Sequence, residues 1–145
     1  MKMIHLAGSA RQEEAAASGT VKPGYLLEVT SSGAVKAHAT QGGYAERAFA
    51  LEDALQGRSI ADDYADGARV TYKLELPGNV VNAVLKPGYN YAVGAALISA
   101  GDGTLKTAAG ASSGVTVKQI VAFVEKAINL TASGAVATRS PVRVA

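Results

Sequence analysis

The feature that most constrains the fold is a strict alternation of side chains over residues 69–76. Every odd-numbered position is polar and every even-numbered one is apolar, which is typical of a strand with one face on a core and the other in water. Glycine makes up 16 of the 145 residues, and cysteine is absent. We therefore predict short strands joined by tight turns, stabilised by packing or association and not by disulfides.

The tetrapeptide KPGY occurs twice, at residues 22–25 and 86–89. Proline fixes φ at the first central position of a turn and glycine accepts positive φ at the second, so each copy predicts a turn. A strand, a glycine turn and a second strand are expected after each. The repetition reflects either a duplicated unit or turn physics acting twice, and we favour turn physics.

Three further segments complete the predicted fold. Ser59 and Asp62 have the spacing of a capping box, which predicts one short helical turn over residues 59–65. Residues 117–130 fit an apolar helix stripe or a buried strand, and the β character of the surrounding chain favours strand. Residues 141–145 are expected to form an edge strand, because Pro141 cannot donate to a ladder.

The predicted fold class is all-β: a small antiparallel β-barrel or sandwich with one short helical turn and an extended N-terminal arm. Residues 1–20 form the arm, and residues 21–145 form a single β-rich domain. This length suits one core.

Charge and targeting signals narrow the partners. The net charge of +2 is too small to indicate nucleic acid. Seven of the 12 acids fall within residues 46–75, whereas residues 106–145 carry five bases and one acid, so neighbouring copies or partners could meet through complementary surfaces. The N-terminus lacks the apolar core of a signal peptide. We expect a soluble protein made in the cytosol, with no membrane partner.

The sequence contains no recognisable catalytic or cofactor motif. His5 and His38 stand outside any metal-ligand spacing. Residues 62–67, DDYADG, resemble the start of a calcium loop, but the twelfth position of that loop is Lys73 and not glutamate. Phosphate-binding glycine patterns and a nucleophile elbow are also lacking. We therefore predict that the protein is not an enzyme and binds no metal or cofactor.

The order of these pieces resembles a known family. Residues 49–70, FALEDALQGRSIADDYADGARV, and the ending TRSPVRVA are similar to the small capsid decoration, or cement, proteins of tailed bacteriophages. The resemblance covers roughly residues 20–145 and rests on turns and core positions.

The resemblance implies a structural virion protein on the outside of the expanded capsid, made in the host cytoplasm. Such a protein bridges major capsid subunits and stabilises the shell against the pressure of packaged DNA. Its partners would be the major capsid protein and itself, as a homotrimer or a dimer. The candidate contacts lie in the arm and in the acidic segment: Lys2, Ile4, Leu6, Arg11, Asp62, Asp63 and Asp66. Because Ile4 and Leu6 have no obvious partner strand nearby, we expect the arm to lie along another subunit.

Two alternatives remain. Another phage structural β module, associated with a tail or a fibre, fits the composition almost as well. A small-ligand-binding β domain is the third possibility.

Overall fold

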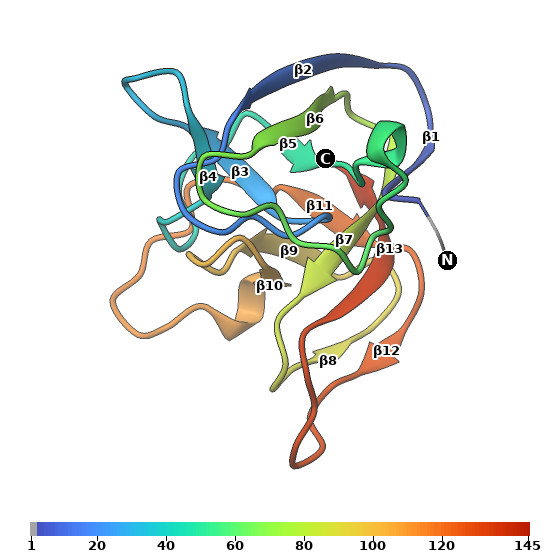
Figure 1. Ribbon diagram of the computed structural model, residues 1–145. Coiled ribbons are helices and arrows are strands. Elements are labelled where there is room, and N and C mark those ends of the chain that lie inside the picture. The colour runs from blue at the N-terminus through green and yellow to red at the C-terminus, as the bar shows by residue number, and fades with distance from the viewer. Residues whose placement is uncertain (1–2) are drawn as a thin grey trace.

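The computed structural model describes residues 3–145 and contains two rings of β-strands packed side by side (Figure 1). We call residues 10–75 the N-barrel and residues 80–144 the C-barrel. The strands of the N-barrel, in ring order, are β2 (Ala10–Ala16), β6 (Arg69–Glu75), β5 (Ala48–Ala50), β3 (Leu26–Val29) and β4 (Val35–Ala37). The strands of the C-barrel are β7 (Val80–Leu85), β13 (Thr138–Val144), β11 (Ala122–Val124), β9 (Ala96–Ser99) and β10 (Leu105–Thr107).

Short elements decorate the two rings. Strand β1 (His5–Ala7) pairs with β7, and β8 (Asn90–Tyr91) pairs with β12 (Ile128–Asn129). The helical content of the described chain is two single 3-10 turns, η1 (Ala54–Gln56) and η2 (Ala108–Gly110). The predicted all-β class is therefore confirmed. Within residues 3–145, no helix has the length and apolar character needed to cross a membrane.

The two barrels are copies of one topology. In each ring all neighbours are antiparallel except at the closing contact, which is parallel: Ala17 meets Val35 in the N-barrel, and Leu105 meets Leu85 in the C-barrel. The register is copied too. Leu27 pairs with Ala37 in the β3–β4 hairpin, and Leu97 pairs with Thr107, each 70 residues later, in the β9–β10 hairpin. The chain therefore contains an internal structural repeat.

The KPGY motif does not mark this repeat. The turn at residues 22–25 closes with Tyr25 N donating to Lys22 O at 3.0 Å, and its counterpart is the turn at residues 92–95, where Ala95 N donates to Ala92 O at 3.1 Å. The second KPGY, at residues 86–89, lies before that counterpart. The two KPGY copies therefore reflect the residue preferences of turns. The internal repeat is seen instead in the order and the pairing register of the strands.

Apolar side chains fill both barrels and the space between them. The N-barrel core contains small residues such as Ala48 and Ala50 together with Tyr64 and Tyr72. A larger cluster in the C-barrel also includes Leu26 and Phe49, which belong to N-barrel strands. The alternation along β3 and β5 thus sends every second side chain to the neighbouring barrel, which binds the two copies into one core.

The long alternating strand is confirmed, with one difference at its end. Val70 and Tyr72 of β6 face the N-barrel core, but Glu75 is buried and Leu76 is 56% exposed. The pattern fails there because the Glu75 carboxylate has polar partners inside the protein, as shown below, while Leu76 has passed into the turn before β7.

The segment at residues 117–130 contains β11 and β12 and no helix, so the strand interpretation is correct. The edge position expected for Pro141 is wrong. Pro141 pairs with Asn82 of β7, and β13 has β11 on its other side. The proline is tolerated because its nitrogen faces the place where β11 has ended, beside Glu125.

The helical turn is predicted in the wrong place. Residues 59–62 form an isolated turn in which Ser59 N donates to Asp62 Oδ2 at 2.6 Å. This is half of a capping box, but no helix follows, because Tyr64 leaves the turn to pair with Val21. The 3-10 turn η1 lies a few residues earlier, at Ala54–Gln56.

Candidate interaction surfaces

Two of the N-terminal candidates, Ile4 and Leu6, are integrated into the fold. Ile4 is fully buried, its N–H donates to Glu52 Oε2 at 3.0 Å, and its carbonyl accepts from Asn82 N at 2.7 Å. Leu6 lies in β1 and is 37% exposed. No partner strand was evident nearby in the sequence because the partner is β7, about 75 positions away.

The other N-terminal candidates have different surroundings. Arg11 lies on β2, is exposed and pairs with Glu13. Lys2 lies outside the described residues. Residue 20, the predicted end of the arm, falls inside the N-barrel, and the extended conformation predicted for the arm is present as β1 and β2.

The three acidic candidates form no single site. Asp62 caps the Ser59 turn, and hydrogen bonds from the Ser59 backbone and hydroxyl lower the pKa of its carboxyl group. Asp66 accepts from Gly19 N at 2.8 Å and so ties two loops together. Asp63 lies 3.7 Å from Lys22 Nζ beside a pocket between the barrels. Asp62 and Asp66 thus each hold loop structure within this chain.

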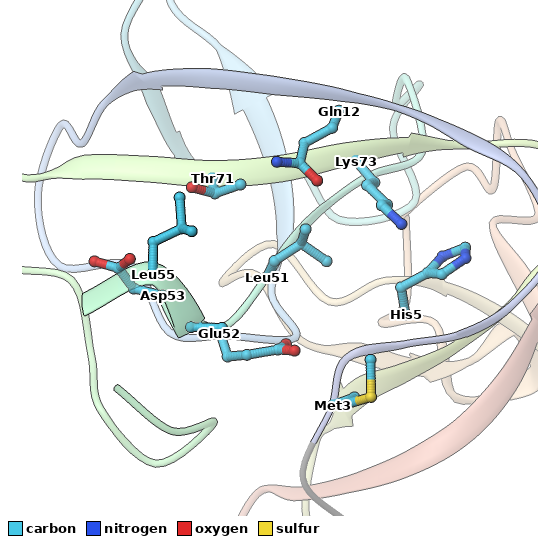
Figure 2. Close-up of a pocket in the computed structure, with 10 residues that line it drawn as sticks. Met3, His5, Gln12, Leu51, Glu52, Asp53, Leu55, Thr71 and Lys73 are labelled. Carbon is cyan, nitrogen blue, oxygen red and sulfur yellow. The ribbon is translucent and has the colours of Figure 1, made fainter. Parts of the chain in front are cut away.

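A cleft of about 310 Å³ lies between β1, β6 and the η1 turn (Figure 2). Met3 and Leu51 supply apolar wall, and Leu55 on η1 is 90% exposed at the rim. Glu52 and Lys73 extend toward the same space in Figure 2. The sequence showed no sign of this cleft, because its residues come from segments that are far apart in the chain.

His5 at the edge of the cleft is held by two acceptors. Its Nδ1 lies 2.8 Å from Glu75 Oε1 and its Nε2 lies 2.8 Å from the Gly8 carbonyl oxygen. The other Glu75 oxygen accepts from Asn79 Nδ2 at 2.7 Å. This network fastens β1 to β6.

His38 has a different role, and sequence reasoning missed it. The ring is buried, with Nε2 2.7 Å from the Tyr44 carbonyl oxygen and Nδ1 2.6 Å from Ser99 Oγ. The Tyr44 ring is 75% exposed and lies 5.9 Å from Lys118 Nζ. A buried histidine thus anchors the backbone of a loop that presents an exposed aromatic side chain, which is the usual form of a contact residue.

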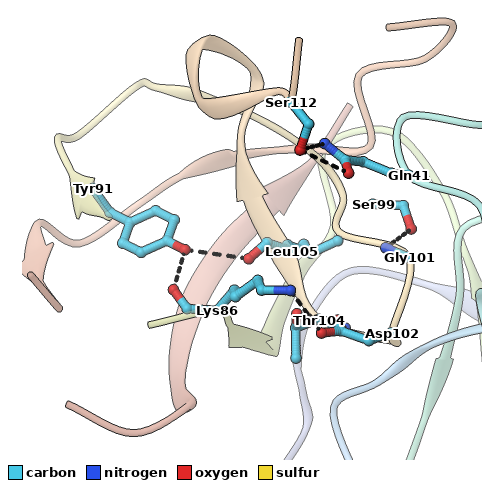
Figure 3. A network of polar contacts seen from close by, with 9 residues as sticks. All are labelled: Gln41, Lys86, Tyr91, Ser99, Gly101, Asp102, Thr104, Leu105 and Ser112. Carbon is cyan, nitrogen blue, oxygen red and sulfur yellow. Dashed lines mark hydrogen bonds and ion pairs between the residues drawn. The ribbon is translucent and has the colours of Figure 1, made fainter. Parts of the chain in front are cut away.

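A second polar network stabilises the C-barrel (Figure 3). Lys86 Nζ lies 3.0 Å from Asp102 Oδ2, and Asp102 Oδ1 accepts from the Thr104 hydroxyl and backbone N–H. Burial alone would raise the pKa of Asp102, but the hydrogen bonds from Thr104 and Lys86 outweigh it and hold that pKa below its ordinary value. These groups satisfy one another, so the network is structural.

Within the described residues, no group of three or more His, Cys, Asp or Glu side chains is arranged to hold a metal ion. Three surfaces are open to contact with other molecules: the cleft beside η1, the exposed Tyr44 loop and the pocket between the barrels.

The comparisons with known proteins bear on the fold alone. No family model matches the sequence, and no curated protein matches it. Among solved structures, the chain is similar to the head fiber gp8.5 N base of bacteriophage phi29, with a TM-score of 0.57 and 11% sequence identity. The match covers 94% of this chain and 95% of the fiber chain. At this identity the likeness shows a shared fold.

Proposed function

We propose that this chain is a structural protein of a bacteriophage virion that attaches to the outside of the capsid. The observation that carries the proposal is the fold match, which spans nearly the whole of this chain and of a phage head fiber base. The sequence resemblance to capsid decoration proteins points to the same particle.

The charge distribution supports association between copies. Residues 10–75 carry ten acids and seven bases, whereas residues 76–145 carry two acids and six bases. The N-barrel is therefore acidic and the C-barrel basic. Opposite charges on the two barrels favour contacts in which the N-barrel of one copy meets the C-barrel of the next. Such head-to-tail contacts form a closed ring when the rotation between copies completes a full turn. A homotrimer on the shell is the assembly that we propose, with the major capsid protein as its partner.

The experiment is co-sedimentation of the purified protein with expanded capsids, followed by negative-stain imaging of the particles. Saturable coating of the shell is expected, with light scattering reporting three times the 14.7 kDa chain mass. Decoration of tails, or no sedimentation with shells, would contradict the proposal. Deletion of residues 1–12 is not a useful test, because it removes β1 and part of β2 from the sheets.

Surface variants test the contact more cleanly. Leu55→Asp changes a side chain that is 90% exposed on η1, so folding should be unaffected. If the cleft faces the shell, this variant should bind capsids about tenfold more weakly. Val136→Asp is a matched control, since Val136 is 70% exposed in the loop before β13.

A further inference from the structure

The pocket between the barrels combines charges from both copies of the repeat. Its volume is about 260 Å³. The N-barrel contributes Lys22, Tyr25, Ala61 and Asp63, and the C-barrel segment contributes Val84, Ala137 and Arg139. Val84 is 4% exposed and forms apolar wall. None of these residues was singled out by the sequence for binding except Asp63.

Arg139 is the least satisfied cation in this pocket. Its Nε donates to the Pro23 carbonyl oxygen at 2.9 Å, which fixes the plane of the guanidinium group. Burial lowers the pKa of Arg139, against the opposing effects of Asp63 and Tyr25. Among the residues that the structure describes, no carboxylate forms an ion pair with Arg139 within 4.0 Å. The two terminal nitrogens therefore keep a planar pair of donors directed away from Pro23.

The internal repeat supplies a control for this observation. The counterpart of Arg139 on β13 is Arg69 on β6, whose Nε lies 2.8 Å from Glu14 Oε2. Glu14 stands opposite Thr71, and the matching pair in the C-barrel is Asn82 opposite Pro141. The carboxylate that pairs with the arginine in one barrel is thus an amide in the other. The C-barrel thus has Arg139 but no carboxylate at the position equivalent to Glu14.

The remaining charges indicate what kind of anion would fit. Lys22 and Arg139 bring two positive charges, and Asp63 brings one negative charge, held at 3.7 Å from Lys22 Nζ. Burial raises the pKa of Tyr25, and Asp102 and Asp63 raise it further, so its hydroxyl stays a neutral donor. One unit of positive charge is left over, which matches a monoanion better than a phosphate dianion.

We propose that this pocket binds a carboxylate group, with Arg139 as its bidentate donor. The two terminal nitrogens of Arg139 match the two oxygens of a carboxylate, Lys22 adds a point charge, and the Tyr25 hydroxyl donates a third hydrogen bond. Val84 and Ala137 contact the carbon chain that bears the carboxylate. The carboxylate is either a free organic acid or an Asp or Glu side chain of a neighbouring protein.

The test uses the purified full-length chain and two probes, sodium acetate and glutamate blocked at its amino and α-carboxyl groups. Binding is followed by NMR through the backbone amides of residues 22–25 and the Nε–H of Arg139, at constant ionic strength. Saturable shifts with a dissociation constant on the order of millimolar are expected for the blocked glutamate. Tighter binding of blocked glutamate than of acetate assigns a protein side chain, and equal binding assigns a free acid; both support a carboxylate site.

Variants decide whether Arg139 acts as proposed. Arg139→Gln should weaken carboxylate binding about tenfold or more. Arg139→Lys should recover only part of this loss, because lysine keeps the positive charge but lacks the planar pair of N–H donors. Arg69→Gln, the matched change in the N-barrel, should leave binding unchanged. If Arg139→Gln is unstable in a thermal melt, Lys22→Gln replaces it, since that side chain is 48% exposed.

Three results would overturn the proposal: no saturable shift with either probe up to about 0.1 M, equal affinity in the Arg139 and Arg69 variants, or tighter binding of sulfate than of carboxylate. Because capsids are not used, failure here is distinct from failure of the proposed virion function.

Discussion

The N-barrel and the C-barrel have the same strands in the same order and register, yet their equivalent side chains have different surroundings. Phe49 on β5 and Phe123 on β11 occupy equivalent positions in the two barrels. Each directly follows an alanine, Ala48 or Ala122, whose side chain faces the core of its own barrel. Phe49 is fully buried in the cluster shared by the two barrels. Phe123 is half-buried on the outside, with the Arg143 guanidinium 5.8 Å from its ring.

This difference shows that strand pairing sets the face of the sheet on which a side chain lies. Whether that face is buried depends on whether the neighbouring barrel packs against it. A duplicated fold offers matched positions at which backbone and pairing are held constant. The effect of the tertiary neighbour can then be measured directly.

The phenylalanine pair gives the largest expected difference. Phe49→Ala should lower the free energy of unfolding by about 3–5 kcal/mol, because it opens a cavity in the shared core. Phe123→Ala should cost about 1 kcal/mol, mainly lost contact with Arg143 and partial burial. Urea denaturation of both variants measures the two values. Similar losses would mean that the barrels do not share one core in solution.

The glycine pair comes next. Gly33 and Gly103 occupy the same position in the two hairpins, with φ of 84° and 85°. Alanine at either costs about 1–2 kcal/mol for the left-handed backbone. A Cβ at Gly103 would also lie 2.6 Å from Tyr25 Cδ2, whereas nothing lies within 4 Å at Gly33.

Gly103→Ala should therefore lose about 1–3 kcal/mol more than Gly33→Ala. Thermal melting of the two variants under one condition tests this expectation. An equal loss would show that the Tyr25 ring moves away at little cost.

The smallest effect is an alkaline one. The Val21–Tyr64 bridge of the N-barrel corresponds to the Tyr91–Ile128 pair of the C-barrel, with the tyrosine on the opposite partner. Each hydroxyl donates to a backbone carbonyl: Tyr64 to Leu51 O at 2.7 Å, and Tyr91 to Lys86 O at 2.5 Å. Burial raises the pKa of Tyr64 from 10.0 to about 12, and burial raises the pKa of Tyr91 as well.

A raised pKa means that the folded state favours the protonated phenol. Its contribution is complete below pH 10 and is lost as the pH rises through about 12. Tyr64→Phe should cost about 1 kcal/mol at neutral pH and should make the fall in stability between pH 10 and 12 shallower. Urea midpoints measured across this range test the expectation; an unchanged slope would contradict it.

Much of the local structure could be predicted because it depends on neighbours in the sequence. The alternation at residues 69–76 located β6 almost to the residue. Turn chemistry located the Pro-Gly turn at residues 22–25. The capping pair Ser59 and Asp62 was also found, but its bond was not followed by a helix.

The candidate site was predicted far less well. Ile4 was proposed as a contact with another subunit and is a core residue, because its partner β7 lies far along the chain. Asp62 accepts from the nearby Ser59 N–H, and Asp66 accepts from Gly19 N–H in a loop that is distant in the sequence. No sequence motif marked four residues that lie on the candidate surfaces or support them, because their surroundings come from segments that meet only in the folded chain. They are His38, Tyr44, Leu55 and Arg139.

The sequence by itself determined that this protein is built from short strands, because side-chain alternation and turn residues act over a few positions. Only the tertiary structure decided that the strands close into two equivalent barrels. The register between distant strands depends on which strands pair in the folded chain, and no local sequence pattern reveals it. It also decided that Phe49 is buried and Phe123 is not, and that Arg139 lacks the carboxylate that Arg69 has. These outcomes depend on which surfaces the two barrels cover when they pack.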